Sequence, residues 1–158
     1  MTQEVLRRIE VTKKEKLDYL DLSGLTLQEI PKEILEVPWI GALSLSQNKI
    51  SDITILSQMR QLHKLALTNN DVEDISALQQ MPKLRFIFLA HNKIKDISTI
   101  QGQTRLKKLV LANNQISFLP DLSPFTLLAY LDLSDNHIDI SVGEKLKVVL
   151  PALKILKI

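Results

Sequence analysis

The chain has 158 residues, the length of a single domain, and 45% of them are hydrophobic, which is enough for a continuous core. Its 20 Lys and Arg nearly balance its 18 Asp and Glu, so a formal charge of +2 gives no general field that would attract polyanions. The absence of Cys excludes disulfides, thiolate nucleophiles and zinc–thiolate sites, so we expect packing alone to provide the stability.

The first predicted element is a helix over about the first fifteen residues, which we expect to cap one open end of the core. Val5, Leu6 and Ile9 are the apolar residues of this helix that we expect to cover the first repeat. Arg7 and Arg8 leave a helix on a membrane surface as the alternative, but the apolar face is too short to favour it. No membrane association is therefore expected.

The same N-terminal segment contains no run of seven or more apolar residues that could form the core of a signal peptide. We therefore expect a cytoplasmic protein. A protein exported without a leader, such as an effector that a bacterium injects into a host, would have the same features. That alternative stays open.

The chain that follows repeats the pattern LxxLxLxxNxIxxI, in which x is any residue. Its four clearest copies begin at Ile40, Leu62, Leu84 and Leu106, which are 22 residues apart. Looser copies begin at Leu17 and Leu128, and a last half-copy begins at Leu153. Since the terminal repeats of solenoid proteins are usually atypical, the looser copies support the same register and bring the total to six copies before the half-copy.

Each copy predicts one short strand of a parallel sheet, because its apolar residues alternate with residues that point outward. The Asn that follows the strand is expected to be structural, since a buried amide can pair backbone groups that a turn leaves unpaired. Stacked copies would form a ladder of Asn48, Asn70, Asn92, Asn114 and Asn136.

The second half of each copy predicts a short helical or 3-10 return. Its apolar residues recur three apart, as at Ile53, Leu56 and Met59. The residues that stand where these returns begin, and that we predict as their N-caps, are Thr54, Ser76 and Ser98.

The end of the chain predicts a second cap. Residues 142–150 predict a helix that returns to a final strand over residues 153–158. This strand would be an unpaired edge of the sheet, and such edges invite association. Self-association through the final strand is therefore one alternative for the function.

By these repeats the chain resembles the leucine-rich-repeat superfamily, and specifically its 22-residue class, which includes a regulatory subunit of protein phosphatase 1. The resemblance implies an α/β right-handed solenoid with a curved parallel sheet on its concave side, short helices or 3-10 turns on its convex side, and a helical N-terminal cap. It divides the chain into a cap (1–16), six repeats (17–140) and a C-terminal cap helix with a final strand (141–158).

The two ends of the chain resemble different branches of this superfamily. VVLPALKIL, from Val148 to Leu156, is similar to the C-terminal cap of several eukaryotic members, although Lys157 stands where that cap usually has Asp. The segment LDLSGLTLQEIP near the start is more similar to bacterial members. We favour a bacterial member.

No group of residues predicts catalysis, a cofactor or a metal ion. The four glycines are scattered over different repeats, where they cannot form a phosphate-binding loop: Gly24, Gly41, Gly102 and Gly143. The motifs HExxH and GxSxG are absent, and a ubiquitin-ligase activity like that of some bacterial repeat effectors would need a Cys. The histidines, His63, His91 and His137, occupy different repeat positions, so a three-histidine metal site is not expected. We therefore expect no enzyme.

One row of polar residues lies just before the ladder position of successive copies. It consists of Gln47, Asn69, His91, Asn113 and Asp135. A polar, solvated turn is favoured for this row over a ligand or ion site.

The outward residues of stacked strands form rows about 4.8 Å apart, which can be interpreted as a surface. Phe86 and Phe88 lie on the same face of one central strand, with Lys64 and Lys108 on either side. Two exposed phenylalanines add nothing to a core that is already filled, so they predict an interface, with cross-strand packing as the alternative. The predicted partner-binding residues are Tyr19, Asp21, Lys64, Arg85, Phe86, Phe88, Lys108, Val110, Tyr130 and Asp132.

The leading hypothesis for the function is a non-catalytic adaptor or regulator that binds another protein on its concave sheet. Nucleic-acid binding along Arg85, Lys107 and Lys108 is the second hypothesis, and the small number of basic residues does not favour it. A bacterial effector or structural module that acts by self-association is the third. The fold by itself names no partner.

Overall fold

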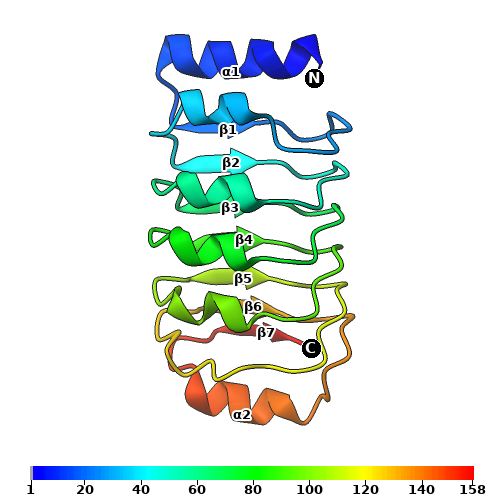
Figure 1. Ribbon diagram of the computed structural model, residues 1–158. Helices are drawn as coiled ribbons and strands as arrows, with labels where there is room; N and C mark the ends of the chain where they lie inside the picture. The colour runs from blue at the N-terminus through cyan, green and yellow to red at the C-terminus, as the bar shows by residue number, and fades with distance from the viewer. Residues whose placement is uncertain (1) are drawn as a thin grey trace.

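The computed structural model describes residues 2–158, in which helices, strands and 3-10 turns are stacked in chain order (Figure 1). Within these residues, seven three-residue strands form one open, parallel sheet in the order β1 to β7. The strands are β1 (Tyr19–Asp21), β2 (Ala42–Ser44), β3 (Lys64–Ala66), β4 (Phe86–Phe88), β5 (Lys108–Val110), β6 (Tyr130–Asp132) and β7 (Ile155–Lys157). Each strand is paired only with its neighbours in the stack, as a solenoid requires.

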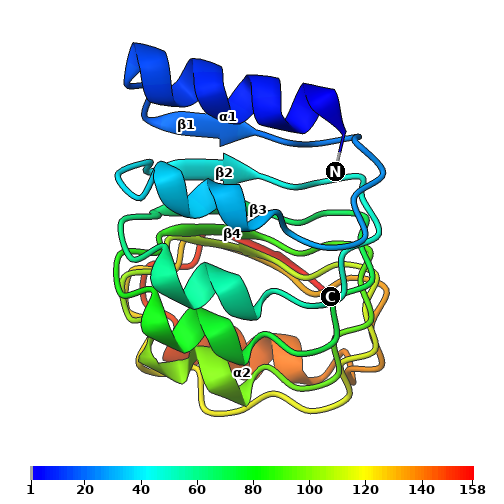
Figure 2. The same ribbon diagram turned by 45° about the horizontal axis from the view of Figure 1, so that its top comes forward.

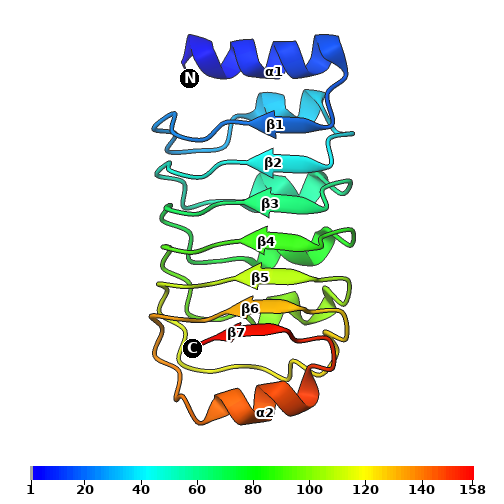
Figure 3. The ribbon, with the colours of Figure 1, turned by 180° about the vertical axis from the view of Figure 1, so that it is seen from behind.

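The returns lie on the opposite side of the core from the sheet, as the views from the front and from behind show (Figures 1 and 3). Four of them contain 3-10 helices: η1 (Lys32–Glu36), η2 (Thr54–Gln58), η3 (Ser76–Gln80) and η4 (Ser98–Gly102). The helices α1 (Gln3–Glu15) and α2 (Val142–Val149) close the two ends of the stack. The predicted solenoid, with its sheet on one side and 3-10 turns on the other, is therefore confirmed.

The core is continuous from one end of the stack to the other, because each strand turns its middle residue inward. These middle residues are all buried in β1 to β6: Leu20, Leu43, Leu65, Ile87, Leu109 and Leu131. The apolar residues of the 3-10 helices, such as Leu56 and Leu78, meet them from the convex side. Each turn of the chain thus buries apolar groups only against its two neighbours.

The helix α1 lies along β1 and covers the first repeat (Figure 2). Val5 and Ile9 are buried, as predicted, but Leu6 is not, since 42% of its surface is exposed. The buried face of α1 instead continues to Thr12, which follows Val5 and Ile9 at helical spacing. The prediction for Leu6 is wrong because it stands about 100° around the helix from Val5.

The two arginines of α1 are paired within the helix. Glu4 accepts hydrogen bonds from Arg7 and Arg8 at 2.7 Å, and these bonds lower the pKa of Glu4 to about 2. Among residues 2–158, no helix has the length and hydropathy needed to cross a membrane. The division of the chain into caps and repeats at residues 16 and 140 stays a prediction.

Aspartates stand just before three of the convex helices, η2, η3 and η4. The prediction that Thr54, Ser76 and Ser98 are the N-caps is wrong, because each is already the first residue of its helix. Two residues before each of them stand Asp52, Asp74 and Asp96, whose carboxylates accept a hydrogen bond from the backbone N–H of that Ser or Thr at 2.7–2.8 Å. The bonds from Thr54 lower the pKa of Asp52, and those from Ser98 lower the pKa of Asp96.

The polar row before the ladder occurs where the backbone adopts a left-handed conformation. All five of its members have φ between 54° and 57°, in the left-handed region: Gln47, Asn69, His91, Asn113 and Asp135. Asn, Asp and His tolerate this region better than most residues, which explains their choice at a position where the chain must turn sharply. The sequence shows which residues recur there but not the sign of φ.

The Asn at the ladder position ties each repeat to the one before it. The Asn92 amide donates to the carbonyl oxygens of Leu67 at 2.9 Å and Leu89 at 3.0 Å, and its oxygen accepts from the N–H of Val72 at 3.0 Å. The same three bonds recur at Asn70, Asn114 and Asn136, and a closely similar set at Asn48. Because each inner carbonyl accepts from the Asn of its own repeat and from the next, the bonds form a chain that runs through the stack.

One buried polar residue interrupts the apolar convex side. Gln103 occupies the position of Met59 and Met81 in the earlier repeats and is 3% exposed. Its amide nitrogen donates to the carbonyl oxygen of Leu78 at 2.6 Å. Its Oε1, in contrast, has no hydrogen-bond partner within residues 2–158, and such a buried acceptor is destabilising.

Replacing Gln103 with Met is therefore expected to raise the free energy of unfolding by about 1 kcal/mol, since Met has a similar volume and no unpaired oxygen. The carbonyl of Leu78 keeps a donor in this variant, because the N–H of Met81 also bonds to it at 3.0 Å. Urea denaturation of the two proteins measures the difference. An unchanged or lower stability in Q103M would show that the amide bond to Leu78 outweighs the unpaired Oε1.

Candidate functional site

The register of the sheet brings outward side chains of separate repeats together. Phe86 of β4 is level with Lys64 of β3 and Lys108 of β5, and Phe88 is level with Ala66 and Val110. The first and third residues of each strand thus form two rows along the concave face. The first row is Tyr19, Ala42, Lys64, Phe86, Lys108, Tyr130 and Ile155, and the second is Asp21, Ser44, Ala66, Phe88, Val110, Asp132 and Lys157.

The two phenylalanines are less exposed than expected. Both are half-buried, and lysines from the neighbouring strands lie over the ring of Phe88. The ammonium groups of Lys64 and Lys108 lie 5.9 and 5.4 Å from the centre of the Phe88 ring. Contacts of this kind contribute about 0.5–1 kcal/mol each at exposed sites. The expectation of two freely exposed rings is therefore wrong.

Lysines and aromatic rings alternate further along the face. The ammonium of Lys108 also lies 4.1 Å from the centre of the Tyr130 ring, and that of Lys157 lies 5.8 Å from the same ring. The result is a Lys–aromatic line, which consists of Lys64, Phe88, Lys108, Tyr130 and Lys157. Since its cations point outward over the rings, the line offers a partner both positive charge and apolar surface.

Asp132 is committed to contacts within the chain. Its carboxylate is buried and accepts from the backbone N–H of Ser134 at 3.2 Å and from the Ser134 hydroxyl at 2.6 Å. Lys157 lies 3.5 Å away. Burial raises the pKa of Asp132, but these hydrogen bonds and the charge of Lys157 outweigh it and leave the pKa below its usual value. A partner would meet Lys157 before it met this carboxylate.

A shallow hollow lies on the concave face at the N-terminal side of the Lys–aromatic line. It is bordered by Tyr19, Asp21 and Lys64, and its floor contains the small outward residues Ala42, Ser44 and Ala66. The structure thus brings three of the predicted residues together around space that the sequence analysis did not identify. The signal was present, because small residues occupy both outward rows at β2 and the second row at β3.

Positive charge gathers along the edge where the strands begin. Arg85 was predicted there, but the edge also carries Arg60, Lys83, Arg105 and Lys107, all of them exposed. We call these five residues the basic margin. Three of them, Arg60, Lys83 and Arg105, were not predicted, because they stand before the first residue of the repeat pattern. His63 stands on the same edge, 3.9 Å from Asp18.

The repeats match a family model for leucine-rich repeats, described as two copies, over residues 60–102 and again over 82–124. The chain is a leucine-rich-repeat protein. No curated protein matches its sequence.

Solved structures of other leucine-rich-repeat proteins have the same fold. An internalin of Listeria monocytogenes is 27% identical, with a TM-score of 0.72, over 82% of this chain and 38% of that one. An internalin C2 of the same organism is 29% identical, with a TM-score of 0.75, over 87% and 59% of the two chains. The ectodomain of the receptor kinase SOBIR1 from Arabidopsis thaliana is 23% identical, with a TM-score of 0.65, over 76% and 71%.

The leucine-rich-repeat protein therefore spans about two fifths to three fifths of the length of these two internalin chains. Its fold is commonly a scaffold for protein interactions, because a curved stack of repeats creates an extended concave surface. This supports a binding role. The 22-residue class and the bacterial source stay predictions.

Proposed function

We propose that the leucine-rich-repeat protein is a non-catalytic adaptor or regulator that binds a partner protein on its concave sheet, centred on Phe86 and Phe88. The observation that carries this proposal is the Lys–aromatic line, with the hollow beside it. Aromatic anchors near the centre and charges at the rim are the usual composition of a protein interface. Both features lie on one face, on strands that the core holds rigidly.

Cross-strand packing alone does not account for the line. The outward neighbours of Phe88 in register, Ala66 and Val110, are smaller than its ring, so they cover it less well than the lysines do. Lysine stems are flexible, and a partner can move them aside to reach the ring. The half-buried phenylalanines would then be fully buried in the complex, which is where aromatic residues contribute most to affinity.

Replacing Phe86 and Phe88 together with Ala is expected to abolish capture of the partner, because the apolar centre of the interface is lost. Immobilised wild-type protein and the variant, each incubated with extract of the native cells and treated with a crosslinker, provide the measurement. Thermal melting of both proteins shows whether the fold survives.

Phe118 provides the matched control, since it is 72% exposed and lies outside the strands. F118A removes one exposed ring from elsewhere on the molecule and should capture the partner as wild type does. Equal capture by F86A/F88A and wild type would refute the proposed surface. Equal loss of capture in F118A and F86A/F88A would also refute the proposed surface, because it would show that any exposed phenylalanine can bind the partner.

A further inference from the structure

The charges of the basic margin are not compensated within the chain. Lys83 and Arg105 occupy the same position of successive repeats, as do Arg85 and Lys107. The N–H of Lys107 bonds to the carbonyl of Arg85 at 2.8 Å, so these two residues lie on neighbouring rungs. Like charges placed opposite one another on a sheet destabilise it.

Within residues 2–158, no carboxylate lies within 4.0 Å of any residue of the basic margin, nor of Lys64 or Lys108. Some cations elsewhere on the molecule do have acidic partners. Lys13 contacts Glu36 at 2.6 Å, and Lys147 contacts Glu144 at 2.7 Å. The repulsion between the cations of the basic margin is thus not offset by acidic partners within the described residues.

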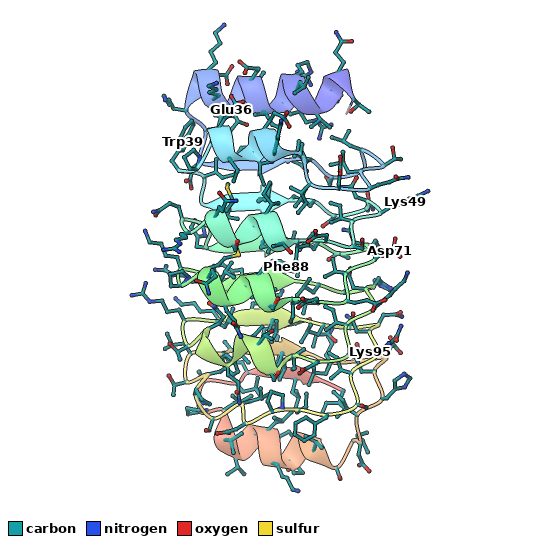
Figure 4. All side chains as sticks on the ribbon, in the orientation of Figure 1. Glu36, Trp39, Lys49, Asp71, Phe88 and Lys95 are labelled. Atoms are coloured by element: carbon teal, nitrogen blue, oxygen red, sulfur yellow. The ribbon has the colours of Figure 1, made fainter. Side chains whose placement is uncertain are left out.

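The opposite edge, where the strands end, shows the contrasting arrangement (Figure 4). Lys49, Asp71 and Lys93 follow one another at the same repeat position, with alternating sign, and Lys93 contacts Asp71 at 2.7 Å. The pKa of Lys93 is raised, chiefly by its hydrogen bond to Asp71. This edge carries charges of both signs. On the edge where the strands begin, the described residues of the basic margin carry positive charge alone, which is open to a ligand.

We infer that the basic margin, with Lys64 and Lys108, binds an acidic segment of a polypeptide. This inference rests on the proposed function, for which it names the chemistry of the partner. Carboxylates would pair with Arg85 and Lys107 at the edge, while an apolar side chain of the same segment contacts Phe88 beside them. Lys108 joins the two regions, because it follows Lys107 in the chain and its ammonium lies over the Phe88 ring.

A nucleic acid fits this surface less well. Its phosphates form a continuous line of charge, whereas the acidic residues Asp71, Glu73 and Asp74 lie together at the other end of the same short strands. They would repel a polyanion wide enough to cover the sheet. A narrow segment with a few carboxylates and an apolar residue avoids this repulsion.

Fluorescence anisotropy of a labelled peptide of alternating Glu and Leu tests the inference on the full chain. We expect R85Q/K107Q to bind this peptide about tenfold more weakly than wild type does, because two of the charge pairs are lost. K49Q/K95Q is the matched control: it removes the same net charge from the opposite edge, where Lys49 and Lys95 lie (Figure 4), and should bind as wild type does. Melting of R85Q/K107Q should occur at the same temperature or slightly higher, since repulsion is relieved.

Three results would overturn the inference. One is equal weakening in K49Q/K95Q, which would indicate only a response to net charge. Another is equal binding of a peptide of alternating Gln and Leu, which would leave the carboxylates without a role. The third is tighter binding of a DNA duplex of matched charge, with a steep salt dependence. None of these results changes the expectation for F86A/F88A, so failure of the inference is distinguishable from failure of the proposed function.

Discussion

Replacing Asn92 with Ala is expected to lower the free energy of unfolding by about 2–4 kcal/mol, more than any exposed substitution. The N–H of Val72 loses the acceptor that the Asn92 oxygen provides at 3.0 Å, and it is left buried without that partner. The carbonyl oxygens of Leu67 and Leu89 each lose one of two amide donors, but keep the one from Asn70 and Asn114 respectively. The unpaired N–H therefore accounts for most of the loss.

N92D separates the roles of the two amide atoms. The carboxylate keeps the acceptor for Val72 but cannot donate, and it places a negative charge beside two carbonyl oxygens. We expect N92D to be at least as unstable as N92A at neutral pH and to recover in part at acidic pH, where the protonated group can donate again. Q115A is the control, since Gln115 is exposed and its loss should change stability by less than about 0.5 kcal/mol. If urea denaturation shows that N92A loses no more stability than Q115A does, the ladder is dispensable.

Replacing Ile87 with Ala is expected to lower the free energy of unfolding by about 2–4 kcal/mol, whereas the same change at the next residue, Phe88, should lower it by about 1 kcal/mol. Ile87 is fully buried on the inner face of β4, in the middle of the stack, so its loss leaves a cavity between two repeats. Phe88 points to the other face and is only half-buried.

The comparison of I87A with F88A tests which face of β4 is the core. Chemical denaturation of both variants gives the free energies, and capture of the partner by the same proteins gives their binding. I87A should capture the partner under conditions where it is folded, while F88A should remain folded and capture it poorly. Larger destabilisation in F88A than in I87A would mean that the faces of β4 are assigned the wrong way round, which a register shift of one residue would cause.

Most of the fold follows from local patterns that the sequence displays. A side-chain period of two predicts Ile87 inside and Phe86 and Phe88 outside, and the 22-residue spacing aligns these positions into rows. The ladder position could be found because the same residue type recurs there. The helices at both ends were predicted within a residue or two.

Several features of the candidate site depended on contacts between repeats, which a single repeat does not reveal. The lysines over Phe88 come from the strands on either side, so its exposure could not be judged from its own strand. The same holds for Asp132, whose carboxylate is held by Ser134 and by Lys157 from the last strand. Its burial is a property of the assembled sheet.

The sequence by itself determined that this chain forms a stack of repeats, which residue of each strand faces the core, and where the aromatic residues lie on the sheet. These follow from periodicity, because a strand or a repeat places every side chain relative to its own backbone. Only the tertiary structure decided which outward residues are covered, that the Asp52 carboxylate accepts from the N–H of Thr54, and that Lys93 pairs with Asp71 on one edge of the sheet while the cations of the basic margin on the other edge have no carboxylate partner among the described residues. Those properties depend on distances between side chains of different repeats, and burial, hydrogen bonding and charge pairing arise only when the repeats are stacked.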